Sequence, residues 1–262
     1  FPRLARHVRE RRQVLLAGEL VFLAGFLLFL GLRSMNPEIT WGEKPMDLSL
    51  LNVFVRAGSL PVSDPWFAGA PLGYYAFGHQ AMAFLTLLTD LPTRLTYNLA
   101  MALLGGLVAQ GAFSLVLSWA GSVRAGLAGA SLLPLLGNLA GLREWLVERR
   151  PRGLPLDWHY FWATSRVVKD TINEYPLWGL LFADLHAHVL AVPFFLLFAA
   201  ACLELVRDHA SGAGPARLAG ASVVVGVAAA GQALTNGWDV PFLGGLVVLT
   251  GLVAAAGEAG VA

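Results

Sequence analysis

Several stretches of this chain approach the length and apolarity that a membrane crossing requires. A helix needs about 20 predominantly apolar residues to cross the hydrocarbon core of a bilayer, and the runs 14–32, 187–206 and 217–235 come close to that length. Hydrophobic residues make up 56% of the 262 residues and charged residues only 13%, a composition outside the soluble globular range. The sequence therefore predicts an integral membrane protein. Its net charge of +1 gives no indication of a nucleic-acid partner.

We expect an all-α fold, with residues 1–262 forming one polytopic transmembrane helix bundle of about seven helical segments. The expected segments are 14–32, 74–91, 95–119, 124–141, 187–206, 217–235 and 240–256. Two long membrane-surface loops, 33–73 and 142–186, interrupt them. Long loops between packed elements are where binding and catalytic residues concentrate. We therefore look for function in these two loops.

The ends of the chain suggest an orientation and a larger context. A basic flank before a span normally stays cytoplasmic, and the first span is preceded by Arg3, Arg6, Arg9, Arg11 and Arg12. The chain starts at Phe and stops inside an Ala- and Gly-rich run. We expect it to be a fragment of a longer protein in a prokaryotic plasma membrane.

The first loop contains acidic residues beside a predicted surface helix. Residues 47–57 can form a short amphipathic helix lying along the membrane surface. Asp47 is either the N-cap of this helix or a carboxylate that takes a proton from a substrate hydroxyl, with Glu43 close by. Asp64 precedes Pro65 and is better explained as a turn former. Trp66, Tyr74 and Tyr75 are aromatic residues near span ends, which often serve as interfacial anchors.

The second loop ends in "TINEYPLWGLLFADLHAH", residues 171–188, just before an apolar run. Asp184, His186 and His188 alternate along the chain, so they share one side only if this segment is extended. We consider three roles for them: ligation of a divalent metal, contact with a phosphate, or capping of the next helix. Glu174 adds a carboxylate to the same stretch.

Cationic and polar side chains also occur upstream and inside the spans. Arg166 and Lys169 could bind a donor phosphate, because a guanidinium can bond two of its oxygens at once. Glu19 and Gln110 are costly in lipid, so both should face other helices. The stretch "TNGWDVP", residues 235–241, either caps helices or contacts a substrate. The sequence has neither a P-loop nor a nucleophile-elbow motif.

Four motifs carry a resemblance to a known family: "NPEITWGEKPMDLSLLN", "DPWFAGAPLGYYAFGH", "TINEYPLWGLLFADLHAH" and "TNGWDVP". Together they resemble the YYY-type multispanning membrane proteins of unknown function (the Chlor_Arch_YYY domain), from about residue 14 to the end. Ala76 replaces the third tyrosine of that family's run, and Ala187 stands where the family usually has proline. Members of that family are longer and carry more spans. The family is distantly similar to the GT-C glycosyltransferases, membrane enzymes that use polyprenyl-phosphate sugars.

The resemblance implies a function and a site. In GT-C enzymes an acid in the first external loop serves the catalytic step, and Asp47 occupies the matching place, with Glu43 as second choice. The implied protein is a glycosyltransferase acting on a lipid-linked sugar at the external membrane face. The donor phosphate would be bound by Arg166, Lys169, His186 and His188, and the sugar cleft would be lined by Trp66, Tyr74 and Tyr75. A transporter or lipid-handling permease, or a structural subunit of a membrane complex, are the alternatives.

This mechanism requires the two long loops to lie on the same side of the membrane. They would lie on opposite sides if segments 74–91, 95–119 and 124–141 all crossed. Pro134 and Asn138 weaken the third of these, so we expect it to dip into the membrane and return. The two loops would then share one side.

Overall fold

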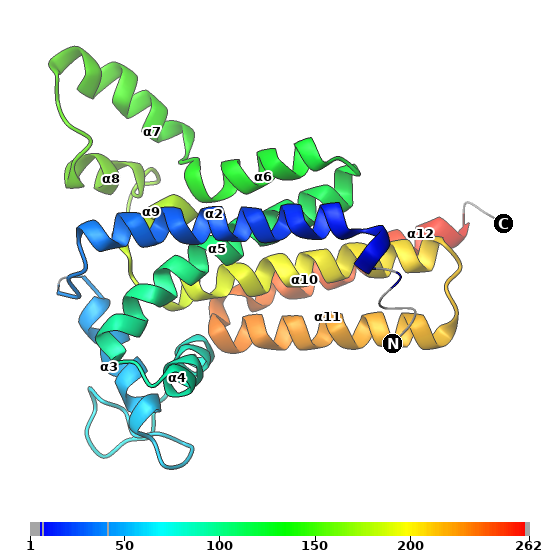
Figure 1. Cartoon of the computed structure of the whole chain (residues 1–262), viewed down its shortest axis with the longest axis horizontal. Coiled ribbons are helices and arrows are strands. Elements are labelled where there is room, and N and C mark those ends of the chain that lie inside the picture. Colours follow the sequence, from blue (N-terminus) through cyan, green and yellow to red (C-terminus); the bar gives the residue numbers. More distant parts are fainter. Residues whose placement is uncertain (1–5, 7, 41, 260–262) are drawn as a thin grey trace.

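The computed structural model is a bundle of long helices with several short helices gathered at one end (Figure 1). It describes residue 6, residues 8–40 and residues 42–259, with side chains through residue 255. Within these ranges the only pairing of extended segments is one isolated bridge between Ser63 and Pro71. The expected all-α class is confirmed.

Each of the seven expected segments contains a helix, but fewer are long enough to cross a membrane. Five candidate spans occur in the described chain: α2 (Arg12–Met35), α5 (Thr93–Ala120), α10 (Ala187–Ala210), α11 (Pro215–Thr235) and the stretch Gly237–Ala255. The last of these joins the short η3 (Gly237–Asp239) to α12 (Val240–Ala259). α6 (Val123–Leu135) becomes a sixth if it is taken with its continuation Leu139–Arg152, which bends away by 70°.

Short helices occupy both long loops. The first loop contains α3 (Lys44–Arg56) and leads into α4 (Phe77–Thr89); the second contains α7 (Leu139–Arg143), η1 (Glu144–Arg149), η2 (Arg150–Arg152), α8 (Trp158–Thr164) and α9 (Pro176–Phe182). They lie toward one end of the bundle in Figure 1, so the two loops gather there. The surface helix expected at 47–57 is present and begins three residues earlier.

The two loops share an end because α4 does not cross. Its 13 residues extend about 20 Å, well short of the ~30 Å hydrocarbon core. His79 near the start of α4 also bonds to Asp47 of α3, and Thr93, the first residue of α5, bonds to Asn52 of α3. α5 then leads away from the loops and α6 returns alongside it. The segment expected to dip and return, 124–141, is bent by 70° where α6 gives way to Leu139–Arg152, which is the geometry of a broken span or a re-entrant loop.

α5 packs against its neighbours through glycines. A Cβ atom added at Gly105 would lie 2.2 Å from the ring of Phe29 in α2, and one at Gly106 would lie 2.8 Å from that of Phe22. On another side, a Cβ at Gly126 of α6 would meet the Phe113 ring at 2.9 Å. Small residues allow such close approach where lipid supplies no hydrophobic driving force between helices. Larger side chains here would push α2 and α6 off α5.

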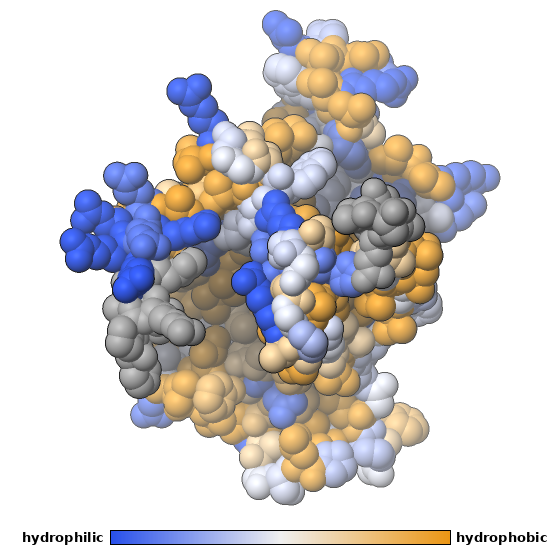
Figure 2. Space-filling model, turned by 90° about the vertical axis from the view of Figure 1, so that its right-hand side faces the viewer, coloured by the Kyte–Doolittle hydropathy of each residue, from blue (hydrophilic) through white to orange (hydrophobic). Residues whose placement is uncertain are grey.

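The polar pair expected inside the spans is formed. Gln110 of α5 donates from Nε2 to Oε1 of Glu19 in α2 at 3.5 Å, which confirms that Glu19 has a polar partner on a neighbouring helix. Around it α2 exposes leucines, including Leu16 at 61% and Leu20 at 64%. Figure 2 views the end of the bundle opposite the loops, where hydrophilic side chains cluster near the helix ends and hydrophobic surface covers much of the flanks. This distribution suits a protein embedded in lipid.

Candidate functional site

The two long loops meet at a buried carboxylate. Asp47 lies in the first turn of α3 and is fully buried, and its Oδ1 is 3.2 Å from Nε2 of His79 and 3.2 Å from Nδ1 of His186. His79 lies near the start of α4, and His186 immediately precedes α10. The expectation that the loops share one side is confirmed by this direct contact. The N-cap interpretation of Asp47 is wrong, because α3 already begins at Lys44.

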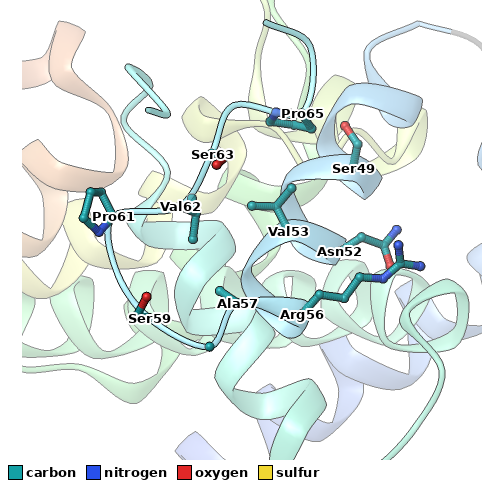
Figure 3. Close-up of a pocket in the computed structure, with 11 residues that line it drawn as sticks. Ser49, Asn52, Val53, Arg56, Ala57, Ser59, Pro61, Val62, Ser63 and Pro65 are labelled. Carbon is teal, nitrogen blue, oxygen red and sulfur yellow. The ribbon is translucent and has the colours of Figure 1, made fainter. Parts of the chain in front are cut away.

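Helical spacing explains why Asp47 faces inward. Lys44, Asp47 and Leu51 fall on one face of α3 and are all buried. Another side of α3 carries Asn52 and Arg56, which line a separate pocket of about 530 Å³ together with residues of loop 57–65 (Figure 3). None of the predicted site residues lines that pocket. α3 therefore presents its acid to the bundle and its neutral and basic side chains to the outside.

A buried tyrosine holds the histidine segment in place. Ala183 ends α9 in the left-handed region with φ 59°, and the following residues are extended up to His186. The Tyr97 hydroxyl, fully buried in α5, donates to the Ala183 carbonyl at 3.2 Å and accepts from the Leu185 N–H at 3.0 Å. Because the segment is extended, alternate side chains can turn toward the same region. This fixes the orientation of His186.

The surroundings of Asp47 favour its ionised form. Burial by itself would raise the pKa of Asp47, but hydrogen bonds from His186 and His79 outweigh it, so the pKa is lowered. Its other oxygen, Oδ2, is buried without a hydrogen-bond partner among the described residues. Asp47 is thus a fixed anion that orients two imidazoles.

The second ring nitrogen of His186 faces the loop surface. Its Nε2 lies 3.2 Å from Oε2 of Glu43 and 3.3 Å from the hydroxyl of Tyr74. Burial opposes the charged imidazolium, but the bond to Asp47 and nearby carboxylates prevail and raise the pKa of His186. When Nδ1–H donates to Asp47, the neutral ring keeps Nε2 as an acceptor. The arrangement suits proton transfer at Nε2.

Asp184 points to a different partner. Its Oδ1 lies 3.8 Å from Nζ of Lys44, whose ammonium sits 4.0 Å from the centre of the Phe182 ring. Burial raises the pKa of Asp184 to about 7, although Lys44 opposes the shift. No three His, Cys, Asp or Glu side chains of the described chain come together in a way that could hold a metal ion. The geometry gives no support to the expected metal site of Asp184, His186 and His188.

A second carboxylate, that of Glu174, contacts both Arg166 and His188. Glu174 Oε1 lies 3.4 Å from Nη1 of Arg166, and its Oε2 lies 3.2 Å from Nε2 of His188. Burial would raise the pKa of Glu174, but the contacts with His188 and Arg166 lower it. The guanidinium of Arg166 lies 4.1 Å from the centre of the Trp162 ring. This cluster brings the expected phosphate ligand Arg166 close to His188.

The cluster around His186 and the cluster around Glu174 open into one cavity of about 470 Å³. Its lining combines acids, imidazoles, a guanidinium and aromatic rings: Glu43, Arg166, Glu174, Asp184, His186 and His188 with Trp158, Trp162, Trp178 and Phe182. The rings of Trp178 and Phe182 stack at 5.0 Å. Asp47 is not among the lining residues and reaches the cavity only through His186.

Three predicted site residues lie elsewhere. Lys169 is exposed and does not line the cavity. Trp66 is 66% exposed, and its Nε1 donates to Ser49. Tyr75 stacks on Tyr74 with ring centres 4.3 Å apart, so only Tyr74 contacts His186 directly. Asp64 accepts hydrogen bonds from two following backbone N–H groups, as expected of a turn former.

Sequence reasoning left two buried residues of this site unassigned. His79 ends the motif "DPWFAGAPLGYYAFGH", and a histidine just inside a predicted span was the available signal. Tyr97 had no such signal, because an aromatic residue in a transmembrane helix is ordinary. Its role comes only from the contact with Ala183 and Leu185.

These observations define an integral membrane protein whose two long loops form one polar cavity at the end of a helix bundle. The chain belongs to the family described as "Uncharacterized membrane protein (DUF2298)", which matches residues 2–262. No curated protein and no solved structure matches it.

Proposed function

We propose that this protein is a GT-C-like glycosyltransferase that takes a sugar from a polyprenyl-phosphate donor at the external face of a prokaryotic plasma membrane. The observation that supports this best is the cavity itself. It joins a carboxylate-backed histidine, a guanidinium and an aromatic wall in about 470 Å³, a volume typical of small-ligand sites. Such groups match the needs of a reaction that deprotonates a hydroxyl and releases a phosphate.

The donor phosphate would contact Arg166. Its guanidinium lies over Trp162, contacts Glu174 and lines the cavity, where it is partly exposed. Positive charge at this position would stabilise the phosphate as it leaves the anomeric carbon. The ring of Trp158, which is 39% exposed, would cover the sugar, and the buried Trp178 would support it from behind.

The proton of the acceptor hydroxyl would pass to His186. The acceptor oxygen forms a bond to the anomeric carbon, the bond from that carbon to the phosphate oxygen breaks, and Nε2 of His186 takes the proton. Asp47 would act as a positioning residue, because it is buried and bonds to Nδ1. Glu43, at 3.2 Å from Nε2, would help to orient the acceptor hydroxyl. The geometry thus favours His186 over Asp47 as the base.

The transport alternative draws less support. Its pathway would join Glu19 and Gln110 to the break in the chain at residues 235–241. Glu19 and Gln110 pair with each other on α2 and α5 and line none of the described cavities, so only Asn236 and Asp239 of this pathway line one. The basic N-terminal flank supports the external orientation, whereas Arg143, Arg149, Arg150 and Arg152 of the second loop favour the cytoplasmic side.

The test is donor turnover by the purified full-length protein in lipid nanodiscs. A polyprenyl-phosphate hexose labelled in the sugar is supplied, and release of polyprenyl phosphate is measured, because this product is the same for every acceptor. His186→Gln should abolish turnover, and His159→Gln should not, because the His159 side chain is 82% exposed on the same loop. Turnover that survives His186→Gln, or no turnover with any donor hexose, would contradict the proposal.

A further inference from the structure

A second cavity of about 460 Å³ lies within the membrane-spanning part of the bundle. Apolar side chains from α5, α6, α10 and α12 form most of its wall, among them Val108, Leu133, Phe195 and Phe242. Phe242 is 70% exposed and Phe195 is 38% exposed. These two rings connect the cavity with the lipid-facing surface, so its contents can exchange with the bilayer.

One end of this cavity carries hydrogen-bond acceptors. Gln232 of α11 is 1% exposed and donates through Nε2 to Oδ2 of Asp239. Asn236 donates to the same oxygen at 3.0 Å. Oε1 of Gln232 is buried and has no partner in the described part of the chain. A buried carbonyl oxygen without a donor is costly, so a bound molecule that supplies an O–H or N–H would stabilise this site.

The charges around the cavity limit what that donor can be. Its titratable lining residues are Glu174, Tyr175, His188 and Asp239, and Arg166 belongs to the neighbouring cavity. A phosphate headgroup would face two carboxylates here, which is unfavourable. An ammonium group would lose its hydration in an apolar chamber, while the Asp239 carboxylate is already compensated by two amide donors. A neutral hydroxyl fits best.

We propose that this cavity binds a long-chain lipid alcohol, with its chain against the apolar wall and its hydroxyl donating to Oε1 of Gln232. The binding site stands independently of the proposed function. Glu174 and His188 line both cavities, so the alcohol would lie beside the proposed donor site, while its hydroxyl at Gln232 is separate from the acceptor hydroxyl proposed at His186.

The experiment compares two photoreactive probes on the full-length wild-type protein in nanodiscs. One is hexadecanol with a mid-chain diazirine, and the other is its methyl ether, which keeps the chain and loses the donor. Adducts are mapped by mass spectrometry. We expect the alcohol to label the wall around Phe195 and Phe242 about fivefold more than the ether, the range that one net hydrogen bond supplies. Equal labelling, or labelling spread evenly over all lipid-facing helices, would overturn the proposal.

Variants and other headgroups complete the test. Gln232→Met keeps the volume and removes the acceptor, so alcohol and ether should label it equally. Gln110→Met removes an amide from another part of the bundle and should keep the preference. Stronger labelling by hexadecylamine or hexadecyl phosphate would also refute the alcohol assignment. The labelling needs no sugar donor, so a positive result alongside absent turnover would keep this site and remove only the glycosyltransferase.

Discussion

His186 and His188 are two residues apart and each contacts a carboxylate at 3.2 Å, yet the two pairs differ in their surroundings. Asp47 is fully buried and bonds to a second histidine, His79. Glu174 keeps 22% of its side chain exposed and shares its charge with Arg166. The first pair is held by the packing of three helices, whereas the second can rearrange. The comparison suggests that the inner pair, Asp47 and His186, sets the geometry of the site, and that the outer pair, Glu174 and His188, admits a ligand.

The inner pair should be the more sensitive to substitution. Asp47→Asn removes the charge that orients His186 and leaves two imidazoles beside a neutral amide. We expect loss of turnover by about 100-fold or more, and destabilisation of about 3 kcal/mol, typical of a broken buried pair. Thermal unfolding in detergent and donor turnover measure the two effects. An effect on folding is expected because Asp47 is fully buried rather than on the surface.

A matched carboxylate outside the core provides the control. Asp170 is exposed and has φ 60°, a conformation that asparagine also tolerates. Asp170→Asn should leave both unfolding temperature and turnover unchanged. If Asp47→Asn likewise left the unfolding temperature and turnover unchanged, Asp47 would not be needed to position His186.

The pH dependence of turnover tests the direction of proton transfer at His186. The pKa of His186 is raised, so its imidazole becomes able to accept a proton only at a pH above the ordinary histidine value. Turnover should therefore rise with pH through this raised pKa, and Asp47, whose pKa is lowered, stays ionised throughout. Asp184 titrates near 7 and could produce a similar limb, so the profile is also measured in Asp184→Asn. If turnover instead fell as pH rose, His186 would act as an imidazolium that binds the phosphate.

The same raised pKa has a consequence for stability. Charged His186 binds Asp47 in the folded protein, and this contribution is complete below the pKa of the unfolded chain and lost as pH rises through the folded pKa. The difference in unfolding temperature between wild type and His186→Gln should shrink over that range. As pH rises, turnover should thus increase while the contribution of the inner pair to the stability of the fold decreases.

Hydrophobic periodicity and composition predicted the helix class and the positions of seven helical segments. They could not distinguish α4 from a crossing helix, because "FGHQAMAFLTLLT" is apolar enough and fails only by length. The loop acids and histidines were identifiable as chemistry-bearing residues. Their pairing was not, since the contact between Asp47 and His186 joins positions 139 residues apart and depends on α5 and α6 together returning the chain to one end.

The outer pair should respond with a change in donor binding. Glu174→Gln removes the anion that occupies Arg166 and His188, so these groups become available to a phosphate. We expect the donor KM to fall about fivefold, while stability changes by about 1 kcal/mol or less, as for partly exposed ion pairs. Glu148→Gln is the control, because Glu148 pairs with Arg152 at 2.9 Å on the same loop and lines none of the described cavities. A rise in KM would show that Glu174 instead supports the ligand.

The smallest effect on donor binding and stability should come from substitution of Lys169, the second candidate cation of the second loop. Arg166 and Lys169 were equivalent candidates for the phosphate, but only Arg166 lies over Trp162 and lines the cavity. Lys169 is exposed, and an exposed side chain outside such contacts usually changes stability by less than about 0.5 kcal/mol. Lys169→Ala should therefore keep both the unfolding temperature and the donor KM of wild type, whereas Arg166→Ala should raise KM at least tenfold, by roughly the value of one charge-assisted hydrogen bond. Equal effects of the two substitutions, measured in the same nanodisc assay, would mean that a diffuse positive surface attracts the donor, and the outer pair would then lose its role as a specific phosphate site.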